Sequence, residues 1–267
     1  MSVPEIIVLG GKGFVGSAIV AAVRRQGREV AVIDLAEYPG SIGMACRVLI
    51  NANGNSKKYL ADKDPTLEFD ASVRSVFRAL YDFRFDYYVQ LSTMDVYADK
   101  GVPAFNSEQA PIDPLRLSRY GHHKWLAEQL VRFNAHSWLI VRMGGFVGPG
   151  LRKNSIYDIL KGLPLRVHPD SCYQYQHCAD LARIVLSLVD RQVSGETLNV
   201  AGDGVISLRE VAAMVPGCNV EHFVPGALVE RCDVNIEKIR KLCPVSKTRE
   251  VVAGFIKDVL TGKEVLT

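Results

Sequence analysis

A glycine-rich turn near the N-terminus constrains the fold more than any other stretch of the chain. Gly10, Gly13 and Gly16 follow the apolar run 5–9, which has strand composition, and precede residues 17–26, whose apolar side chains recur at helical spacing. A strand, a glycine turn and a helix N-terminus form a diphosphate-binding device, because the backbone approaches the phosphates closely and the first helical N–H groups are free. We therefore expect this turn to bind a dinucleotide.

The next predicted strand supports this interpretation and bears on the choice of cofactor. The run 29–33 reads as a strand and ends at Asp34. An acidic residue at about this distance from the glycine turn usually binds the ribose 2′-hydroxyl. Its carboxylate would repel a 2′-phosphate, so Asp34 favours NAD over NADP. Lys12, inside the glycine loop, is a contrary indication, since a basic residue there can assist a 2′-phosphate.

Strand-like and helical patterns alternate through roughly residue 142, which indicates βαβ units and a parallel sheet. We therefore predict an α/β fold of the Rossmann type, with a doubly wound parallel sheet over residues 1–150. Residues 151–267 are expected to form a small C-terminal substrate-binding cap, with segments that return to the first domain. Further strands are expected at 47–51, 86–91, 137–141, 173–177 and 198–200, and helices at 64–83, 119–134, 155–161, 180–189, 208–215 and 250–260.

Charge and cysteine content exclude several other classes of protein. A net charge of +3 over 267 residues is too small to indicate nucleic acid or a membrane surface as partner. No apolar run reaches membrane-spanning length, and the first strand begins too early to leave room for a signal peptide. The six cysteines form no C-x-x-C pair, so we expect reduced thiols in a cytoplasmic protein and no metal site.

A tyrosine and a lysine carry the strongest indication of chemistry. Tyr120 and Lys124 lie four residues apart in the predicted helix 119–134 and so share one face. An unperturbed phenol, with a pKa of roughly 10, is a poor base at neutral pH. The Lys124 ammonium and the positive nicotinamide ring of bound NAD are expected to lower the pKa of Tyr120. Such a tyrosine exchanges a proton with a hydroxyl or carbonyl while hydride moves, and the strand ending in Ser92-Thr93 offers a hydroxyl beside it.

At this point the chain resembles the extended short-chain dehydrogenase/reductase family, the NAD-dependent epimerases and dehydratases of nucleotide sugars. The resemblance spans nearly the whole length. It rests on the order and spacing of five motifs, which are Gly10-x-x-Gly13-x-x-Gly16, Ser92-Thr93-Met94-Asp95-Val96-Tyr97, Tyr120-x-x-x-Lys124, Arg142 with Val147-Gly148-Pro149-Gly150, and Gln176-His177-Cys178-Ala179-Asp180.

The resemblance implies roles for individual residues. It makes Thr93 the hydroxyl that positions the substrate, Tyr120 the acid/base, and Lys124 the residue that tunes the tyrosine and holds the nicotinamide ribose. It implies a small-molecule substrate, a nucleotide sugar, and a homodimer built from helices 66–83 and 119–134, with Phe69, Phe77, Trp125 and Leu130 at the interface. The cofactor contacts that it implies are Gly10, Gly13, Phe14, Val15, Gly16, Asp34, Asn51, Ser92, Tyr120 and Lys124.

Several positions depart from the family pattern. Only sixteen residues separate Asp34 from Asn51, where relatives fit a further helix and strand, so we expect a more open adenine side. The nucleotide-sugar assignment is weakened because Ser72 and Gly145 replace asparagines and Tyr173 replaces an arginine. These departures leave a second hypothesis open, that of a catalytically weak dinucleotide-binding sensor or structural protein.

Three further residues near the motifs keep alternative interpretations. Asp95 is a candidate second acid, although dehydratases carry an Asp-Glu pair where this chain has Met94-Asp95. His122 and His123 lie inside the Tyr–Lys turn and are read as solvent-facing helix residues rather than catalytic ones.

Overall fold

The computed structural model of the chain describes residues 4–55, 57–218 and 220–267. These residues form two units. The first unit comprises the described residues up to Ala98 together with 108–143 and 182–198, and the second comprises 99–107, 144–181 and 199–267.

A six-stranded sheet carries the first unit and confirms the predicted α/β, doubly wound fold. Its strands are, in spatial order, β2 (Val30–Ile33), β1 (Ile6–Leu9), β3 (Ala45–Asn51), β4 (Arg84–Thr93), β5 (Trp138–Met143) and β9 (Glu196–Val200). The pairs β1–β2, β1–β3, β3–β4 and β4–β5 are all parallel. The chain order reverses between β1 and β3, and open α/β sheets bind ligands beyond the carboxyl ends of their strands at such a point.

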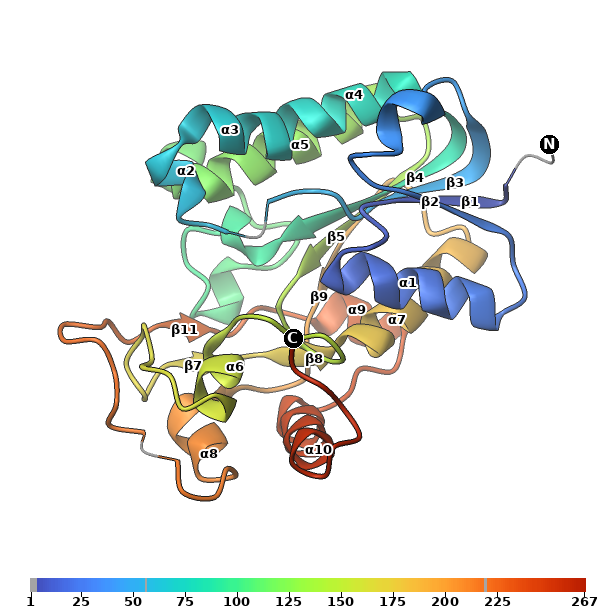
Figure 1. Ribbon diagram of the computed structural model, residues 1–267. Coiled ribbons are helices and arrows are strands. Elements are labelled where there is room, and N and C mark those ends of the chain that lie inside the picture. Colours follow the sequence, from blue (N-terminus) through green and yellow to red (C-terminus); the bar gives the residue numbers. More distant parts are fainter. Residues whose placement is uncertain (1–3, 56, 219) are drawn as a thin grey trace. The chain divides into compact units, whose positions relative to one another are not determined.

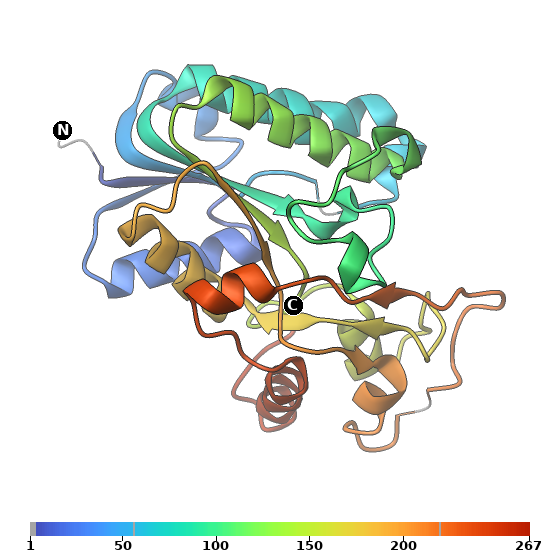
Figure 2. The ribbon, with the colours of Figure 1, turned by 180° about the vertical axis from the view of Figure 1, so that it is seen from behind.

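Helices cover both faces of this sheet. Helix α1 (Phe14–Arg25) lies on one face, whereas α4 (Ser75–Asp82) and α5 (Arg119–Asn134) lie side by side on the other (Figures 1 and 2). The second face is held by a hydrophobic cluster in which sheet residues meet small side chains of the two helices. The buried members of this cluster include Ile7, Leu49, Tyr88, Ile140, Ala79, Ala127 and Val131. Parallel strands covered on both sides are expected to be apolar throughout, as β1 is.

The connection between β2 and β3 contains only a short 3₁₀ turn, Tyr38–Ser41. The short segment between Asp34 and Asn51 therefore changes the edge of the sheet. No helix or additional strand separates Asp34 from β3 within the described ranges 4–55 and 57–218, and β2 becomes an edge strand of the sheet.

The helix predicted from Asp64 begins where expected but is not regular. The Asp64 side chain accepts a hydrogen bond from the Leu67 N–H, and Pro65 occupies the first turn, which is a favourable helix start. Helix α3 (Pro65–Phe69) then passes through a π-helical turn, Asp70–Arg74, before α4 continues. A short helix α2 (Leu60–Lys63) precedes them. Because a π turn adds a residue to one helical turn, it changes which side chains face inward afterwards.

The second unit is built from short elements. Its strands are β6 (Gly145–Val147), β7 (Cys172–Tyr173), β8 (Tyr175–His177), β10 (Ile206–Ser207) and β11 (Arg231–Cys232), and its helices are α6 (Ser155–Leu160), α8 (Leu208–Ala212), α9 (Glu237–Leu242) and α10 (Thr248–Leu260). Helix α7 (Cys178–Asp190) has residues in both units. The single strand predicted at 173–177 is in fact two, because β7 pairs with β10 and β11 whereas β8 pairs with β6.

Among the described residues, no helix is long and apolar enough to cross a membrane. In the same part of the chain, no group of three or more His, Cys, Asp or Glu side chains is arranged to hold a metal ion.

Candidate functional site

The glycine loop has the geometry that a diphosphate site requires. Gly10 has φ +73°, a conformation that favours glycine. A Cβ atom added to Gly16 would lie 2.1 Å from the Gly10 carbonyl oxygen, so only glycine lets α1 approach the loop this closely. Gly13 is the N-cap of α1 and has no side chain with which to cap the N–H groups that follow at Phe14 and Val15. These residues therefore fit a dinucleotide diphosphate, which would accept hydrogen bonds from that helix N-terminus.

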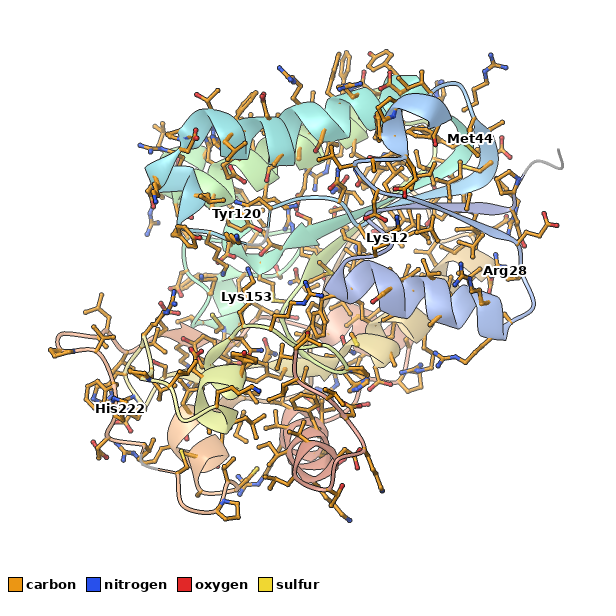
Figure 3. All side chains as sticks on the ribbon, in the orientation of Figure 1. Lys12, Arg28, Met44, Tyr120, Lys153 and His222 are labelled. Atoms are coloured by element: carbon orange, nitrogen blue, oxygen red, sulfur yellow. The ribbon has the colours of Figure 1, made fainter. Side chains whose placement is uncertain are left out.

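Acidic groups border this loop at the end of β2. The Lys12 backbone N–H donates to Asp34 Oδ2 at 3.1 Å, which places the Asp34 carboxylate beside the loop. The Lys12 ammonium, labelled in Figure 3 near the start of α1, forms an ion pair with Glu37. That hydrogen-bonded ammonium lowers the pKa of Glu37. The basic residue of the glycine loop is thus paired with Glu37, a carboxylate outside the glycine-turn motif.

Asn51 lies at the carboxyl end of β3 and is buried. Its Nδ2 donates to the Tyr88 hydroxyl at 2.8 Å, and its Oδ1 accepts from the Asn53 N–H at 3.0 Å. The Asn51 side chain is therefore engaged in the sheet and in the turn that follows. Asn51, which is expected from the sequence to contact the cofactor, therefore has its amide already bonded within the protein.

The two hydroxyl residues at the end of β4 have different surroundings. Ser92 is buried and donates to Glu128 Oε1 at 2.6 Å, and Glu128 in turn pairs with Arg142 at 2.7 Å. Thr93 donates to Asp95 Oδ2 at 3.0 Å, and the same oxygen pairs with the Lys58 ammonium at 2.6 Å. Ser92 thus belongs to a buried charged network, whereas Thr93 contacts Asp95, which pairs with the largely exposed Lys58.

Helix α5 brings Tyr120 and Lys124 together, as its predicted bounds imply. Both side chains are buried, at 8% and 5% exposure. A Cβ atom added to Gly121 would lie 2.1 Å from the Asp95 carbonyl oxygen, so α5 packs directly on the turn that follows Thr93. The Tyr120 hydroxyl donates to the Asn55 carbonyl at 3.1 Å, and the Lys124 ammonium donates to the Leu91 carbonyl at 3.5 Å. Thr93, Tyr120 and Lys124 are therefore gathered between the end of β4 and the start of α5.

The electrostatics of this group differ from the sequence-based expectation. Burial raises the pKa of Tyr120 above its usual value, and the charges of Asp95 and Glu68 raise it further. Burial also lowers the pKa of Lys124, an effect that Glu68, Glu128 and Asp95 oppose. Lys124 therefore does not make Tyr120 acidic in the protein by itself, because desolvation and two carboxylates favour the neutral phenol.

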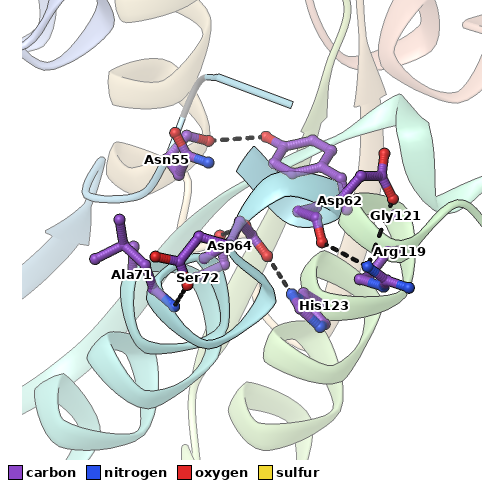
Figure 4. Close-up of polar contacts among 12 residues, drawn as sticks. Asn55, Asp62, Asp64, Ala71, Ser72, Arg119, Gly121 and His123 are labelled. Atoms are coloured by element: carbon purple, nitrogen blue, oxygen red, sulfur yellow. Dashed lines mark hydrogen bonds and ion pairs between the residues drawn. The ribbon is translucent and has the colours of Figure 1, made fainter. Parts of the chain in front are cut away.

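A buried carboxylate beneath the site was not foreseen. Glu68, on α3, is 0% exposed, accepts from the Ser72 hydroxyl and contacts Nδ1 of His123 on α5. Figure 4 labels its two partners, Ser72 and His123. The interpretation of His123 as solvent-facing is wrong, because His123 is buried against this carboxylate. Leu67 and Phe77, on the same helical segment, are instead 54% and 44% exposed. A glutamate in an amphipathic pattern gives no signal of burial. The π turn comes after Glu68, so it changes the inward face only for later residues such as Phe77.

These elements define a Rossmann-type α/β protein with the Thr, Tyr and Lys arrangement of the extended short-chain dehydrogenases/reductases. The family model described as "NAD dependent epimerase/dehydratase family" matches residues 41–201, which is more than half of the chain. The chain belongs to this family. The match includes Thr93, Tyr120 and Lys124, whereas the glycine loop precedes it. A search of curated proteins gave no match.

Solved structures with the same fold extend the similarity over most of the chain. A UDP-galactose 4-epimerase is 24% identical, with 96% of this chain and 99% of that chain covered and a TM-score of 0.76. MoeE5 in complex with UDP-glucuronic acid and NAD is 19% identical, with 97% and 99% covered and a TM-score of 0.80. The dTDP-4-dehydrorhamnose reductase of Bacillus anthracis str. Ames in complex with NADP is 16% identical, with 97% and 99% covered and a TM-score of 0.76. At these identities the comparisons establish the fold.

Proposed function

We propose that this protein is an NAD-dependent oxidoreductase or epimerase that acts on a sugar, in the form of a nucleotide sugar. The observation that carries the proposal is the grouping of Thr93, Tyr120 and Lys124 where α5 packs on the turn after β4. Family membership and the uncapped N-terminus of α1 support dinucleotide binding. The second unit is proposed as the substrate-binding part, because the first unit supplies the cofactor loop and the catalytic residues.

In this mechanism Tyr120 is the acid/base. Its hydroxyl gives a proton to a sugar carbonyl, or takes one from a sugar hydroxyl, and Thr93 holds the same oxygen in place. Bound NAD supplies the acceptor or donor of hydride. Lys124, buried one helical turn from Tyr120, stabilises the phenolate as the proton leaves and holds the nicotinamide ribose. The Tyr120 hydroxyl donates to the Asn55 carbonyl in this structure, so a substrate oxygen has to replace that partner before proton transfer.

The choice of NAD rests on Asp34. Its carboxylate stands beside the glycine loop at the end of β2, where a ribose 2′-hydroxyl would donate a hydrogen bond to it. A 2′-phosphate would meet a negative charge at the same place. Gly10, Gly13, Phe14, Val15 and Gly16 are proposed to contact the diphosphate through the backbone.

The second unit gives less information about the group attached to the sugar, which is a nucleotide diphosphate in a nucleotide sugar. Tyr173, where relatives carry an arginine, donates to the Glu230 carboxylate at 2.8 Å. Burial and this carboxylate raise the pKa of Tyr173, so it stays neutral. An anionic group placed here would meet Glu230 rather than a cation. We therefore expect the diphosphate of a nucleotide sugar to be held by other groups, or the group attached to the sugar to be smaller.

A panel of nucleotide sugars and free sugars, assayed with NADH or NAD, tests this function. Tyr120→Phe removes the transferable proton but keeps the ring, so turnover should fall roughly 10²–10⁴-fold while NADH binding persists. Tyr81→Phe, which alters an exposed tyrosine that donates to Asn134, is the matched control and should retain turnover. Unchanged turnover in Tyr120→Phe would refute the catalytic assignment.

The second candidate function is a dinucleotide-binding sensor without turnover. The hydrogen bond from the Tyr120 hydroxyl to the Asn55 carbonyl favours this alternative, because it occupies the proton that the mechanism would transfer. A protein that binds NADH but converts no sugar in the panel would support it.

A further inference from the structure

The turn after β2 carries a second carboxylate that is fixed by the backbone. Glu37 Oε2 accepts from the Asp34 N–H at 3.2 Å, and the Glu37 carbonyl accepts from the Ser41 hydroxyl at 2.9 Å. The Tyr38 N–H donates to the Asp34 carbonyl at 3.0 Å, which closes the turn. Glu37 is therefore held in the turn rather than placed by its rotamer alone.

Lys12 is bound to both carboxylates of this turn. Its backbone N–H donates to Asp34 Oδ2 at 3.1 Å and to Oδ1 at 3.4 Å, and its ammonium pairs with Glu37 Oε1. The tip of the glycine loop is thus tied to the end of β2 by its backbone and by its charge. Lys12 is the group in this loop that could attract a 2′-phosphate, and Glu37 already neutralises it.

We propose that Glu37 is a specificity-determining residue, which acts with Asp34 to exclude NADP by holding the Lys12 ammonium and by adding a second negative charge at the ribose site. This inference rests on the proposed binding of a dinucleotide to the glycine loop. It assigns the discrimination to two carboxylates and a sequestered lysine rather than to Asp34 alone.

The physical reason is a balance of charges and not the strength of one ion pair. Both side chains of the pair are largely exposed, at 63% and 41%, and exposed ion pairs contribute little stability. A 2′-phosphate, however, carries close to two negative charges and would have to displace Glu37 from Lys12 beside Asp34. A neutral 2′-hydroxyl pays no such electrostatic cost, because it donates a hydrogen bond to a carboxylate.

The test compares dissociation constants for NADH and NADPH by calorimetry or by ligand fluorescence. Glu37→Gln removes the charge but keeps an oxygen able to accept from the Asp34 N–H. At the separations of neighbouring side chains we expect about five- to tenfold tighter NADPH binding and less than about twofold change for NADH. Adding Lys12→Met should abolish the gain. Glu250→Gln, which removes an equal charge in the second unit, is the control and should change neither constant.

The dependence of NADPH binding on ionic strength is a second measurement. A purely structural effect of Glu37→Gln would not depend on salt. The gain of Glu37→Gln for NADPH should shrink as ionic strength rises, because exposed charges are screened. The inference would be overturned if Glu37→Gln left the ratio of the NADH and NADPH dissociation constants unchanged. It would also be overturned if NADPH still bound more tightly than to wild type after Lys12→Met was added. Either result would leave dinucleotide binding itself intact. Failure of the wild-type protein to bind either dinucleotide would instead overturn the proposed function and, with it, this inference.

Discussion

At the scale of single residues, the site shows how burial competes with neighbouring charge. Tyr120 and Lys124 are adjacent on α5, and the sequence leads one to expect that the ammonium makes the phenol acidic. The structure adds Asp95 and Glu68, whose charges raise the pKa of Tyr120 in the same direction as burial. These carboxylates come from separate segments of the chain, so a local pattern around Tyr120 carries no information about them.

An alkaline titration tests this environment. Because the folded pKa of Tyr120 lies above its unfolded value of about 10, this group stabilises the fold below that pH and loses its contribution as pH rises through the folded pKa. Tyrosinate absorbance of wild type minus Tyr120→Phe should therefore show no ionisation near pH 10 without ligand. Saturating NAD should move the difference signal to lower pH. A tyrosine that ionises normally in the free protein would contradict the buried, carboxylate-flanked site.

At the scale of elements, the sequence located the long regular segments well. The predicted helix 119–134 has the bounds of α5, and β4 ends at Thr93 as expected. The structure adds that the Ser118 hydroxyl caps the start of α5 by accepting from the Gly121 N–H. Errors occur where a tertiary contact overrides the local pattern. The strand expected at 173–177 divides because its two halves join different sheets, and the helix after Asp64 changes phase at its π turn. Neither event has a local signature.

The Glu68 cluster gives a prediction for the α3–α5 contact. Glu68→Ala leaves His123 and Ser72 buried without their shared acceptor, and we expect a loss of about 3–5 kcal/mol in the free energy of unfolding. Glu68→Gln keeps an acceptor for one partner and should cost less. Urea unfolding of both variants measures the difference. Equal, small losses would show that the cluster does not tie α3 to α5.

At the scale of the whole molecule, apolar side chains on the outer faces of the helices predict self-association. Phe69 and Phe77 are exposed, and the Phe77 ring lies at a tilt to that of the more exposed Tyr81, with 4.8 Å between ring centroids. Exposed aromatic side chains gathered on one helical segment are typical of an interface. These residues include two of the four implied by the family resemblance.

A charge on this surface should separate the subunits. We expect a dimer at micromolar concentration by light scattering, and Phe77→Asp should shift it to monomer, since an aspartate in an apolar interface loses its hydration. Leu228→Asp, at an exposed position in the second unit, serves as the control and should remain dimeric. A wild-type monomer would argue against this interface.

The edge position of β2 has a consequence for how long a cofactor stays. With only the turn Tyr38–Ser41 between β2 and β3, we expect the adenine half of a bound dinucleotide to have fewer protein neighbours than a further helix and strand would give it. Fewer contacts shorten residence mainly through faster dissociation. A redox-neutral epimerisation needs the dinucleotide to stay through both hydride transfers, whereas a reductase must exchange it every cycle. We therefore expect rapid NADH release in stopped-flow displacement. Such release would suit a reductase, which exchanges its dinucleotide in every cycle, better than an epimerase, which retains it.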